Sequence, residues 1–190
     1  MKNAETLREA MRLGRVYRRQ DLDGLTTAVD RDLKTLVESG EVRKLGYGLY
    51  CRMKKNAFGE APPDNRELVR AFLKTDDFLL TSYNNFTNLG LGLTQVYNTA
   101  VVYNHKRAGE FLLGGKRFQF RLVPAYPKVL SKEYLLVDLF NNLRKLPDNV
   151  SAVHDNLKYR VQDFDQSKVS EYLERYGSAA ARRTLREVYA

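Results

Sequence analysis

Nine side chains between positions 18 and 47 have the chemistry to contact a polyanion such as nucleic acid. Arginine and lysine pair with phosphates and with guanine edges, and hydroxyl groups bond phosphates or bases. The nine are Arg18, Arg19, Thr26, Thr27, Arg31, Lys34, Arg43, Lys44 and Tyr47. Arg31 is the best candidate for a bidentate contact with guanine, and Arg18 and Arg19 are candidates for phosphate contacts.

A helix over residues 25–38 would position four of these side chains. Its apolar residues recur at three- and four-residue steps and therefore form one stripe. They are Leu25, Ala28, Val29, Leu33, Leu36 and Val37. The opposite face carries the two threonines, Arg31 and Lys34. Thr26 and Thr27 are placed to cap the start of the helix, and Ser39-Gly40 is placed to end it.

The flanking segments predict the order helix, turn, helix and basic hairpin. Residues 4–13 read as a first helix, 18–22 as a short second helix, and Asp23-Gly24 as the turn before residues 25–38. Strands over 41–45 and 49–53 flank Gly46-Tyr47-Gly48. This order is typical of a winged helix-turn-helix, in which one helix enters the major groove beside a ribbon. The same unit can instead dock proteins, and that alternative stays open.

Composition and charge narrow the class of partner. The chain has 190 residues and a formal net charge of +9. Such an excess favours polyanionic partners because phosphates attract it over long range. The single cysteine, Cys51, excludes an internal disulfide, fits a reducing cytoplasm and should be a small packed residue. The chain lacks an apolar run of membrane-helix length and a signal-peptide core, which predicts a cytoplasmic protein without a membrane partner.

The sequence changes character after the hairpin, which predicts an α+β protein of two domains. We expect a winged helix-turn-helix domain over residues 1–55, a linker over 56–63, and a mixed α/β domain with a helical C-terminal tail over 64–190. Asp64-Asn65 should cap a helix over 66–74. Strands are expected over 77–83, 98–103, 110–113 and 116–123, and helices over 132–146, 151–164, 166–176 and 179–188. In the last strand, Phe118, Phe120 and Leu122 would face the core.

The rest of the chain offers no convincing catalytic or metal site. The two histidines, His105 and His154, lie far apart in the sequence. Gly114-Gly115 is better explained as a hairpin turn than as a phosphate loop, and Asp165 as a helix cap. The polar and aromatic residues 82–88 could line a groove, but a turn with a helix cap is favoured. The sequence therefore predicts a protein that is not an enzyme and uses no metal or cofactor.

The C-terminal helix carries a second basic group. Arg182, Arg183 and Arg186 fall within one turn, opposite Leu185 and Val188. This face could extend a DNA-contacting surface, meet an acidic protein or be a plain solvated face.

Four segments together resemble the AbiEi-type antitoxins of type IV toxin–antitoxin systems over nearly the whole length. The first is the hairpin ending Gly46-Tyr47-Gly48-Leu49-Tyr50, which is close to the wing ending of that family. The others are Phe58-Gly59-Glu60-Ala61-Pro62-Pro63, residues 88–95 (NLGLGLTQ) and residues 133–142 (EYLLVDLFNN).

The resemblance implies a transcriptional autorepressor and antitoxin. In that family the N-terminal domain binds inverted repeats in double-stranded DNA at its own promoter. The C-terminal domain counters a nucleotidyltransferase-type toxin encoded by the next gene. The alternative is a protein-interaction module that binds a partner protein without sequence-specific DNA binding. An enzyme with a nucleic-acid substrate is the weakest hypothesis, because it needs a metal or nucleophile site.

Overall fold

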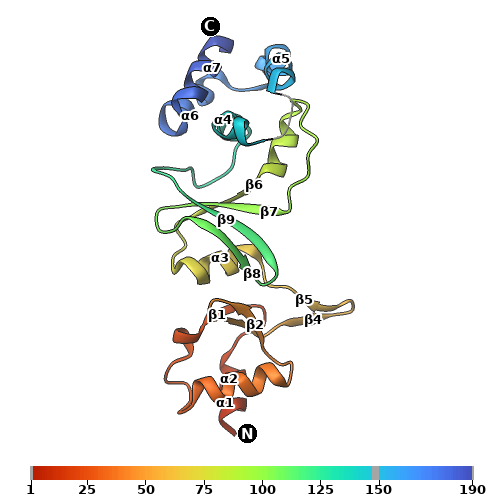
Figure 1. Cartoon of the computed structure of the whole chain (residues 1–190), viewed down its shortest axis with the longest axis vertical. Coiled ribbons are helices and arrows are strands. Elements are labelled where there is room, and N and C mark those ends of the chain that lie inside the picture. The colour runs from red at the N-terminus through yellow and green to blue at the C-terminus, as the bar shows by residue number, and fades with distance from the viewer. Residues whose placement is uncertain (1, 147–149, 190) are drawn as a thin grey trace. The chain divides into compact units, whose positions relative to one another are not determined.

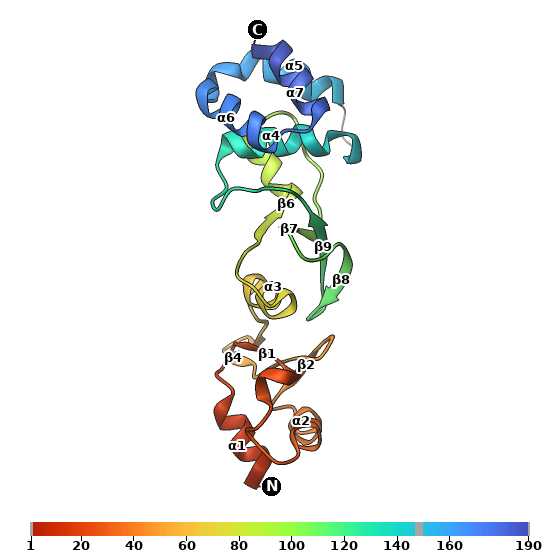
Figure 2. The same cartoon turned by 90° about the vertical axis from the view of Figure 1, so that its left-hand side faces the viewer.

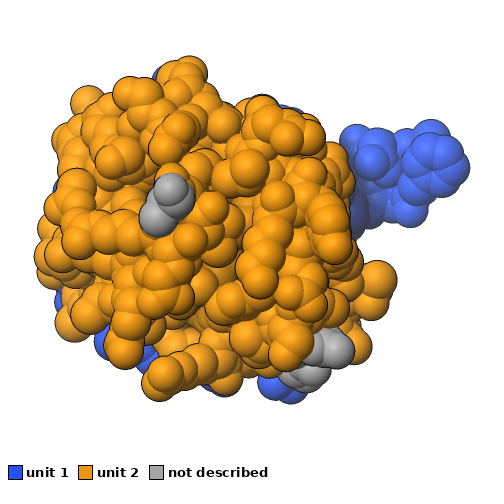
Figure 3. All heavy atoms as spheres, turned by 90° about the horizontal axis from the view of Figure 1, so that it is seen from above, with its two compact units in different colours: residues 1–78, 106–118 blue, residues 79–105, 119–190 orange. Residues whose placement is uncertain are grey.

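Helices and strands are mixed along the chain, which confirms the α+β class. A computed structural model describes residues 2–146 and 150–189 (Figures 1 and 2). Contacts divide the chain into two compact units, which are coloured separately in Figure 3. Unit 1 comprises Met1–Phe78 and Lys106–Phe118, and unit 2 comprises Leu79–His105 and Gln119–Ala190. This division differs from the expected boundary at residues 56–63, because later elements group with the N-terminal ones.

Unit 1 begins with a helical core beside a small sheet. Its first elements are α1 (Lys2–Ala10), β1 (Val16–Arg18), the 3-10 helix η1 (Arg19–Leu22), α2 (Val29–Glu38), β2 (Arg43–Gly46) and β3 (Leu49–Cys51). The sheet is antiparallel with the order β1-β3-β2, so that Tyr50 lies opposite both Tyr17 and Lys44. Leu7, Leu22 and Leu33 are buried between the helices. The short helix before the turn and the hairpin after α2 are both present, as expected.

Helix α2 begins four residues later than predicted. Its N-cap is Ala28, which makes no side-chain capping bond, so the prediction that Thr26 and Thr27 cap the helix is wrong. After Gly24, with φ at +80°, the chain runs through a further turn in which the amide of Leu25 donates to the carbonyl of Leu22. The predicted end is confirmed, because Ser39 is the C-cap and Gly40 follows with a positive φ.

The segment expected to be a linker contains a hairpin instead. Strands β4 (Lys54–Asn56) and β5 (Gly59–Ala61) pair antiparallel. Apolar alternation could not predict this hairpin, because its residues are exposed except for the half-buried Ala61. Helix α3 (Asn65–Leu73) follows, and Asp64 caps it as predicted by accepting a hydrogen bond from the amide of Arg66 at 2.7 Å.

A four-stranded sheet has the order β6-β7-β9-β8. Its strands are β6 (Leu79–Ser82), β7 (Thr99–Asn104), β8 (Gly109–Leu113) and β9 (Lys116–Leu122), and η2 (Tyr83–Leu89) follows β6. The predicted Gly114-Gly115 turn joins β8 to β9. Phe118 and Phe120 are buried as expected, but Leu122 is 56% exposed. That part of the prediction is wrong, because the inward alternation of β9 stops at its last residue.

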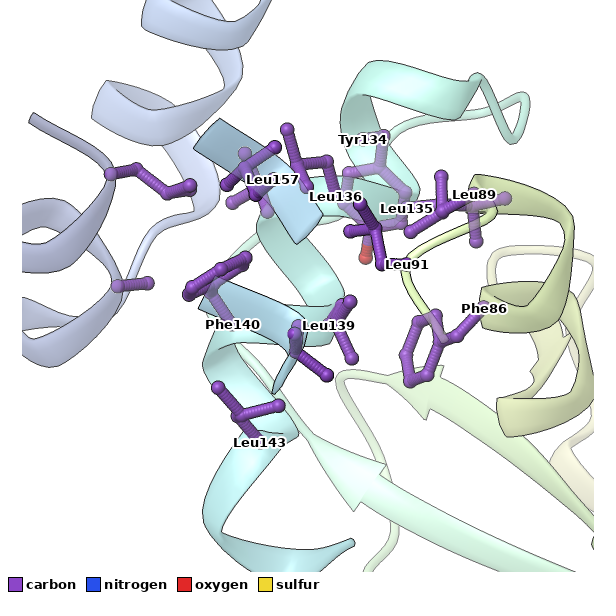
Figure 4. Packing of buried hydrophobic residues seen from close by; sticks show 14 of the residues in the cluster. Phe86, Leu89, Leu91, Tyr134, Leu135, Leu136, Leu139, Phe140, Leu143 and Leu157 are labelled. Atoms are coloured by element: carbon purple, nitrogen blue, oxygen red, sulfur yellow. The ribbon is translucent and has the colours of Figure 1, made fainter. Parts of the chain in front are cut away.

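Helices form the remainder of unit 2. They are α4 (Lys132–Asn142), η3 (Leu143–Lys145), α5 (Val150–Arg160), η4 (Val161–Asp163), α6 (Gln166–Tyr176) and α7 (Ala179–Tyr189). Figure 4 shows Leu136, Leu139 and Phe140 of α4 in the same buried cluster as Phe86 and Leu157. This cluster gives unit 2 a core of its own.

Candidate nucleic-acid interface

The exposed face of α2 carries two of the predicted cations. The side chains of Arg31 and Lys34 are 72% and 77% exposed. Nε of Arg31 lies 3.7 Å from Asp32, and Nζ of Lys34 lies 3.8 Å from Glu38, distances longer than a hydrogen bond. The Lys34–Glu38 pair is long and exposed on both sides, so it holds Lys34 weakly and leaves it able to move onto an external anion. The Arg31–Asp32 contact is also long, but the Asp32 side chain is only 6% exposed, so Arg31 would leave a buried carboxylate behind on moving to an external anion.

Arg19 is held by two carboxylates. Its Nε and Nη2 donate to the two carboxylate oxygens of Asp30 at 2.8 and 2.7 Å, and its Nη1 donates to Asp23. The hydrogen bonds from Arg19 lower the pKa of Asp30. A phosphate contact by Arg19, as the sequence predicted, would have to replace these carboxylates.

Arg18 is the N-cap residue of η1. Its guanidinium donates to Asp21 at 2.6 and 3.2 Å, and its backbone amide donates to the same carboxylate at 2.9 Å. Burial alone would raise the pKa of Asp21, but the hydrogen bonds from Arg18 bring that pKa below its usual value. Arg18 therefore has a structural role, and it too would need to exchange its partner to meet a phosphate.

The two threonines have different surroundings. Thr27 is exposed, and its Oγ1 accepts a hydrogen bond from Nδ2 of Asn3 at 3.4 Å. Thr26 is half-buried, and its Oγ1 has no hydrogen-bond partner among residues 2–146 and 150–189. Of the two hydroxyls, Thr27 is the one on the surface beside α2.

The β2–β3 ribbon presents Arg43 and Lys44 at its surface. Both side chains are exposed, and Nη2 of Arg43 lies 2.5 Å from Oε2 of Glu60 in β5. The pair links the β2–β3 ribbon to the β4–β5 hairpin.

Tyr47, at the tip of the β2–β3 ribbon, packs against the protein. Its ring meets Phe72 of α3 and Phe111 of β8 edge-on, with both centroid distances at 5.6 Å, although 61% of the residue is exposed. Its φ of +49° is rare for a non-glycine residue. The guanidinium of Arg107 lies over Phe72 at 4.5 Å. Tyr47 thus anchors the ribbon tip within unit 1.

A cleft of about 460 Å³ in unit 1 brings Arg18 together with charged residues that the sequence did not single out. It is lined by Arg15, Val16, Tyr17, Arg18, Asp21, Arg70, Ala71, Lys74, Thr75 and Asp76. Arg70 donates to Glu67 at 2.9 and 3.1 Å, and Arg15 lies over the Tyr17 ring at 5.8 Å. The cleft therefore mixes cations with carboxylates. Residue spacing along the chain could not predict this cleft, because α3 and β1 come together only in the folded protein.

The basic group of the C-terminal helix is largely engaged within unit 2. Arg182 donates to the carbonyls of Leu173 and Glu174 at 3.1 and 2.7 Å, and Arg186 pairs with the Glu174 carboxylate. Arg183 is exposed. Arg182 and Arg186 thus join α7 to α6.

The residues considered for catalysis lie apart. His105 is exposed and stacks on Tyr126, whereas His154 is half-buried against Phe140. Cys51 is buried as expected, and burial raises the pKa of its thiol to about 11, so it is a poor nucleophile at neutral pH. Within residues 2–146 and 150–189, no three His, Cys, Asp or Glu side chains group as a metal site would require.

Unit 2 contains a buried polar network that the sequence did not predict. Oδ1 of Asp138 accepts hydrogen bonds from Tyr103 Oη at 2.7 Å and from Asn142 Nδ2 at 3.0 Å. Arg121 donates to Oδ1 of Asn142 at 2.5 Å. Burial raises the pKa of Asp138 to about 6, although the hydrogen bond from Tyr103 and the charge of Arg121 act to lower it.

The turn with a helix cap favoured for residues 82–88 is confirmed, because Ser82 caps η2.

Comparison with known proteins gives a fold but no family. No family model and no curated protein matches the chain. It is similar to the crystal structure of the RV2827C protein from Mycobacterium tuberculosis, with 15% identity and a TM-score of 0.60. The match covers 99% of this chain and 76% of that one, so the likeness extends over both units. In the described ranges, the helices lack the combined length and apolar character that crossing a bilayer requires.

Proposed function

We propose that the protein is a DNA-binding transcriptional autorepressor and that the N-terminal part of unit 1 is its winged helix-turn-helix. The observation that carries this proposal is the exposed pair Arg31 and Lys34 on α2, a helix whose other face is buried by Val29, Leu33 and Leu36. A helix of this kind fits the major groove of B-DNA, where an arginine can pair with guanine. In this arrangement η1 and its turn precede the recognition helix α2.

The surrounding charges support the same surface. Lys44 is exposed on the ribbon that follows α2, where it can hold a phosphate without reading sequence, whereas Arg43 would first have to leave Glu60. The net charge of +9 adds long-range attraction to the duplex. On inverted repeats, two copies of the chain would bind, one on each half-site.

The second part of the proposal is that unit 2 acts as the antitoxin region and counters a nucleotidyltransferase-type toxin. The resemblance to AbiEi-type antitoxins supports it. So do the apolar side chains of Val96 and Val129, which are 80% and 75% exposed on unit 2 and available to a protein partner. Co-expression with the product of the adjacent gene tests this part. We expect growth to be rescued by the full chain and by a chain with Arg31→Ala.

The DNA-binding part is tested by titrating the purified protein onto DNA from upstream of its own coding sequence. Scrambled DNA of the same composition serves as the reference. We expect tighter binding to the upstream DNA, because base contacts by α2 add to the phosphate contacts that both DNAs share.

A further inference from the structure

The β4–β5 hairpin of unit 1 is a projecting ribbon with an apolar tip. Every residue from 54 to 60 is exposed, and Phe58 at the tip is 99% exposed. Figure 1 shows the hairpin extending away from the helices of unit 1. Phe58 therefore adds nothing to the core, and its whole ring is available to a partner.

A side-chain hydrogen bond and a glycine support the turn at the tip. Asn56 lies opposite Gly59, so that Ala57 and Phe58 form a two-residue turn. Oδ1 of Asn56 accepts a hydrogen bond from the amide of Phe58 at 2.9 Å, and Gly59 takes a φ of +112° that other residues rarely adopt. The ring is thus presented by a preorganised turn, which lowers the entropy cost of inserting it.

The ribbon below the tip is basic. Lys54 and Lys55 are exposed on β4, and the acidic residue of β5, Glu60, is neutralised by Arg43 at 2.5 Å. Positive charge around an apolar tip matches a polyanion that has an apolar interior. Duplex DNA has this chemistry, with phosphates lining the minor groove and stacked bases within it.

The β2–β3 ribbon is less able to insert a side chain into DNA, because its tip is packed against the protein. The tip of β2–β3 is anchored by Tyr47 against Phe72 and Phe111. The β4–β5 hairpin has no such packing at its tip, since Phe58 is almost fully exposed.

We infer that the β4–β5 hairpin is a minor-groove arm that inserts Phe58 between base steps and bends the DNA beside the segment contacted by α2. This inference rests on the proposed DNA-binding function and deepens it by adding a second contact. Insertion of an apolar side chain from the minor groove partly unstacks a base step and kinks the duplex toward the major groove. The arm would add specificity for flexible pyrimidine–purine steps without base-edge hydrogen bonds.

The test measures DNA bending together with affinity for the full chain. Upstream DNA carrying a fluorophore at each end reports the end-to-end distance by energy transfer. We expect the wild type to shorten that distance. Phe58→Ala should abolish the shortening and weaken binding by roughly tenfold, as expected from losing the burial of one aromatic side chain. Phe58→Leu should retain most of the bend, because leucine also acts as a wedge.

A matched control is Tyr159→Ala in α5, which removes an aromatic side chain from a residue that is 79% exposed on unit 2. It should bend and bind DNA as the wild type does. Because Phe58 is exposed in the free protein, Phe58→Ala should also leave the unfolding temperature unchanged, so that a lost bend cannot be attributed to misfolding.

The outcomes separate the arm from the proposed function. If the wild type binds its upstream DNA selectively, and Phe58→Ala bends and binds that DNA as the wild type does, the minor-groove arm is wrong but the repressor function is not affected. The arm is also overturned if Phe58→Ala binds and bends DNA normally but loses the toxin, because the tip then serves a protein partner. A wild type without preference for its upstream DNA overturns the repressor itself.

Discussion

Arg19 and Asp30 form a bidentate ion pair that joins η1 to the exposed face of α2. Nε and Nη2 of Arg19 donate to the two carboxylate oxygens of Asp30 at 2.8 and 2.7 Å. The pair has two consequences for a DNA-binding surface. The pair engages Arg19, which the sequence predicts to contact phosphate. It also places the Asp30 carboxylate, which is 75% exposed, next to Arg31.

Asp30→Asn should therefore tighten binding to every DNA sequence. The change removes a negative charge that repels phosphate and one of the two carboxylates that hold Arg19, so the salt dependence of binding should steepen by about one phosphate contact. Gel-shift titrations over a salt series measure both quantities. Asp155→Asn, on α5 of unit 2, is the matched control and should have no effect. Weaker binding by Asp30→Asn would show that the pair is needed to position α2.

Arg31→Ala and Lys44→Ala should differ in selectivity. Loss of Arg31 should weaken binding to the upstream DNA by about 1–3 kcal/mol and affect scrambled DNA much less, because the guanine contact is sequence-specific. Loss of Lys44 should weaken both DNAs alike. Lys158→Ala, in α5, removes another exposed lysine and should leave binding to both DNAs unchanged. Equal losses on both DNAs for Arg31→Ala would contradict the assignment of Arg31 to a base.

Tyr47 should contribute to the stability of unit 1 through its two ring contacts. Each edge-on aromatic pair contributes about 0.5–1.5 kcal/mol beyond its area, so Tyr47→Ala should lower the free energy of unfolding by about 1–3 kcal/mol. Tyr47→Phe keeps both contacts and should unfold like the wild type. Denaturant titrations measure the difference. If Tyr47→Ala proves as stable as Tyr47→Phe, the ring does not anchor the ribbon.

Asp138 should make the stability of unit 2 depend on pH. Burial raises its pKa from the ordinary 3.8 to about 6, so the folded state binds a proton more tightly than the unfolded state does. This contribution is fully present below about pH 4 and is lost as the pH rises through 6. The free energy of unfolding should therefore fall by about 3 kcal/mol over that interval.

Asp138→Asn mimics the protonated carboxyl and should lack this dependence. Its Oδ1 can still accept the hydrogen bond from Tyr103. Because all other side chains are shared, the difference in free energy of unfolding between the two proteins isolates Asp138. Between pH 4 and pH 7, the free energy of unfolding of Asp138→Asn should rise relative to that of the wild type. A difference that stays constant over this range would mean that Asp138 ionises normally in the folded protein.

Strong local signals predicted much of the fold. Helix α6 has the predicted bounds, since apolar spacing and the Asp165 cap act within a few residues of one another. The hairpins at Gly46-Tyr47-Gly48 and Gly114-Gly115 followed from glycines at tight turns. Signals of this kind require no knowledge of distant parts of the chain.

Features that depend on distant contacts were missed. The cations Arg15 and Arg70 share a cleft only because α3 packs near β1. Asp138 lies on a helix, and a carboxylate there is normally expected to face water, yet Tyr103 and Asn142 satisfy it inside the protein. The nine candidate contacts were predicted as side chains on a surface, whereas packing decides that Tyr47 also touches Phe72 and Phe111.

Titration of the wild-type protein onto its own upstream DNA and onto scrambled DNA, at low and at physiological salt, decides whether the protein binds DNA sequence-specifically. Our account predicts that preference for the upstream DNA survives the higher salt, because α2 contributes base contacts in addition to phosphate contacts. Binding that is equal on both DNAs and disappears on both at physiological salt would contradict it, since the net charge of +9 would then suffice to explain the interaction.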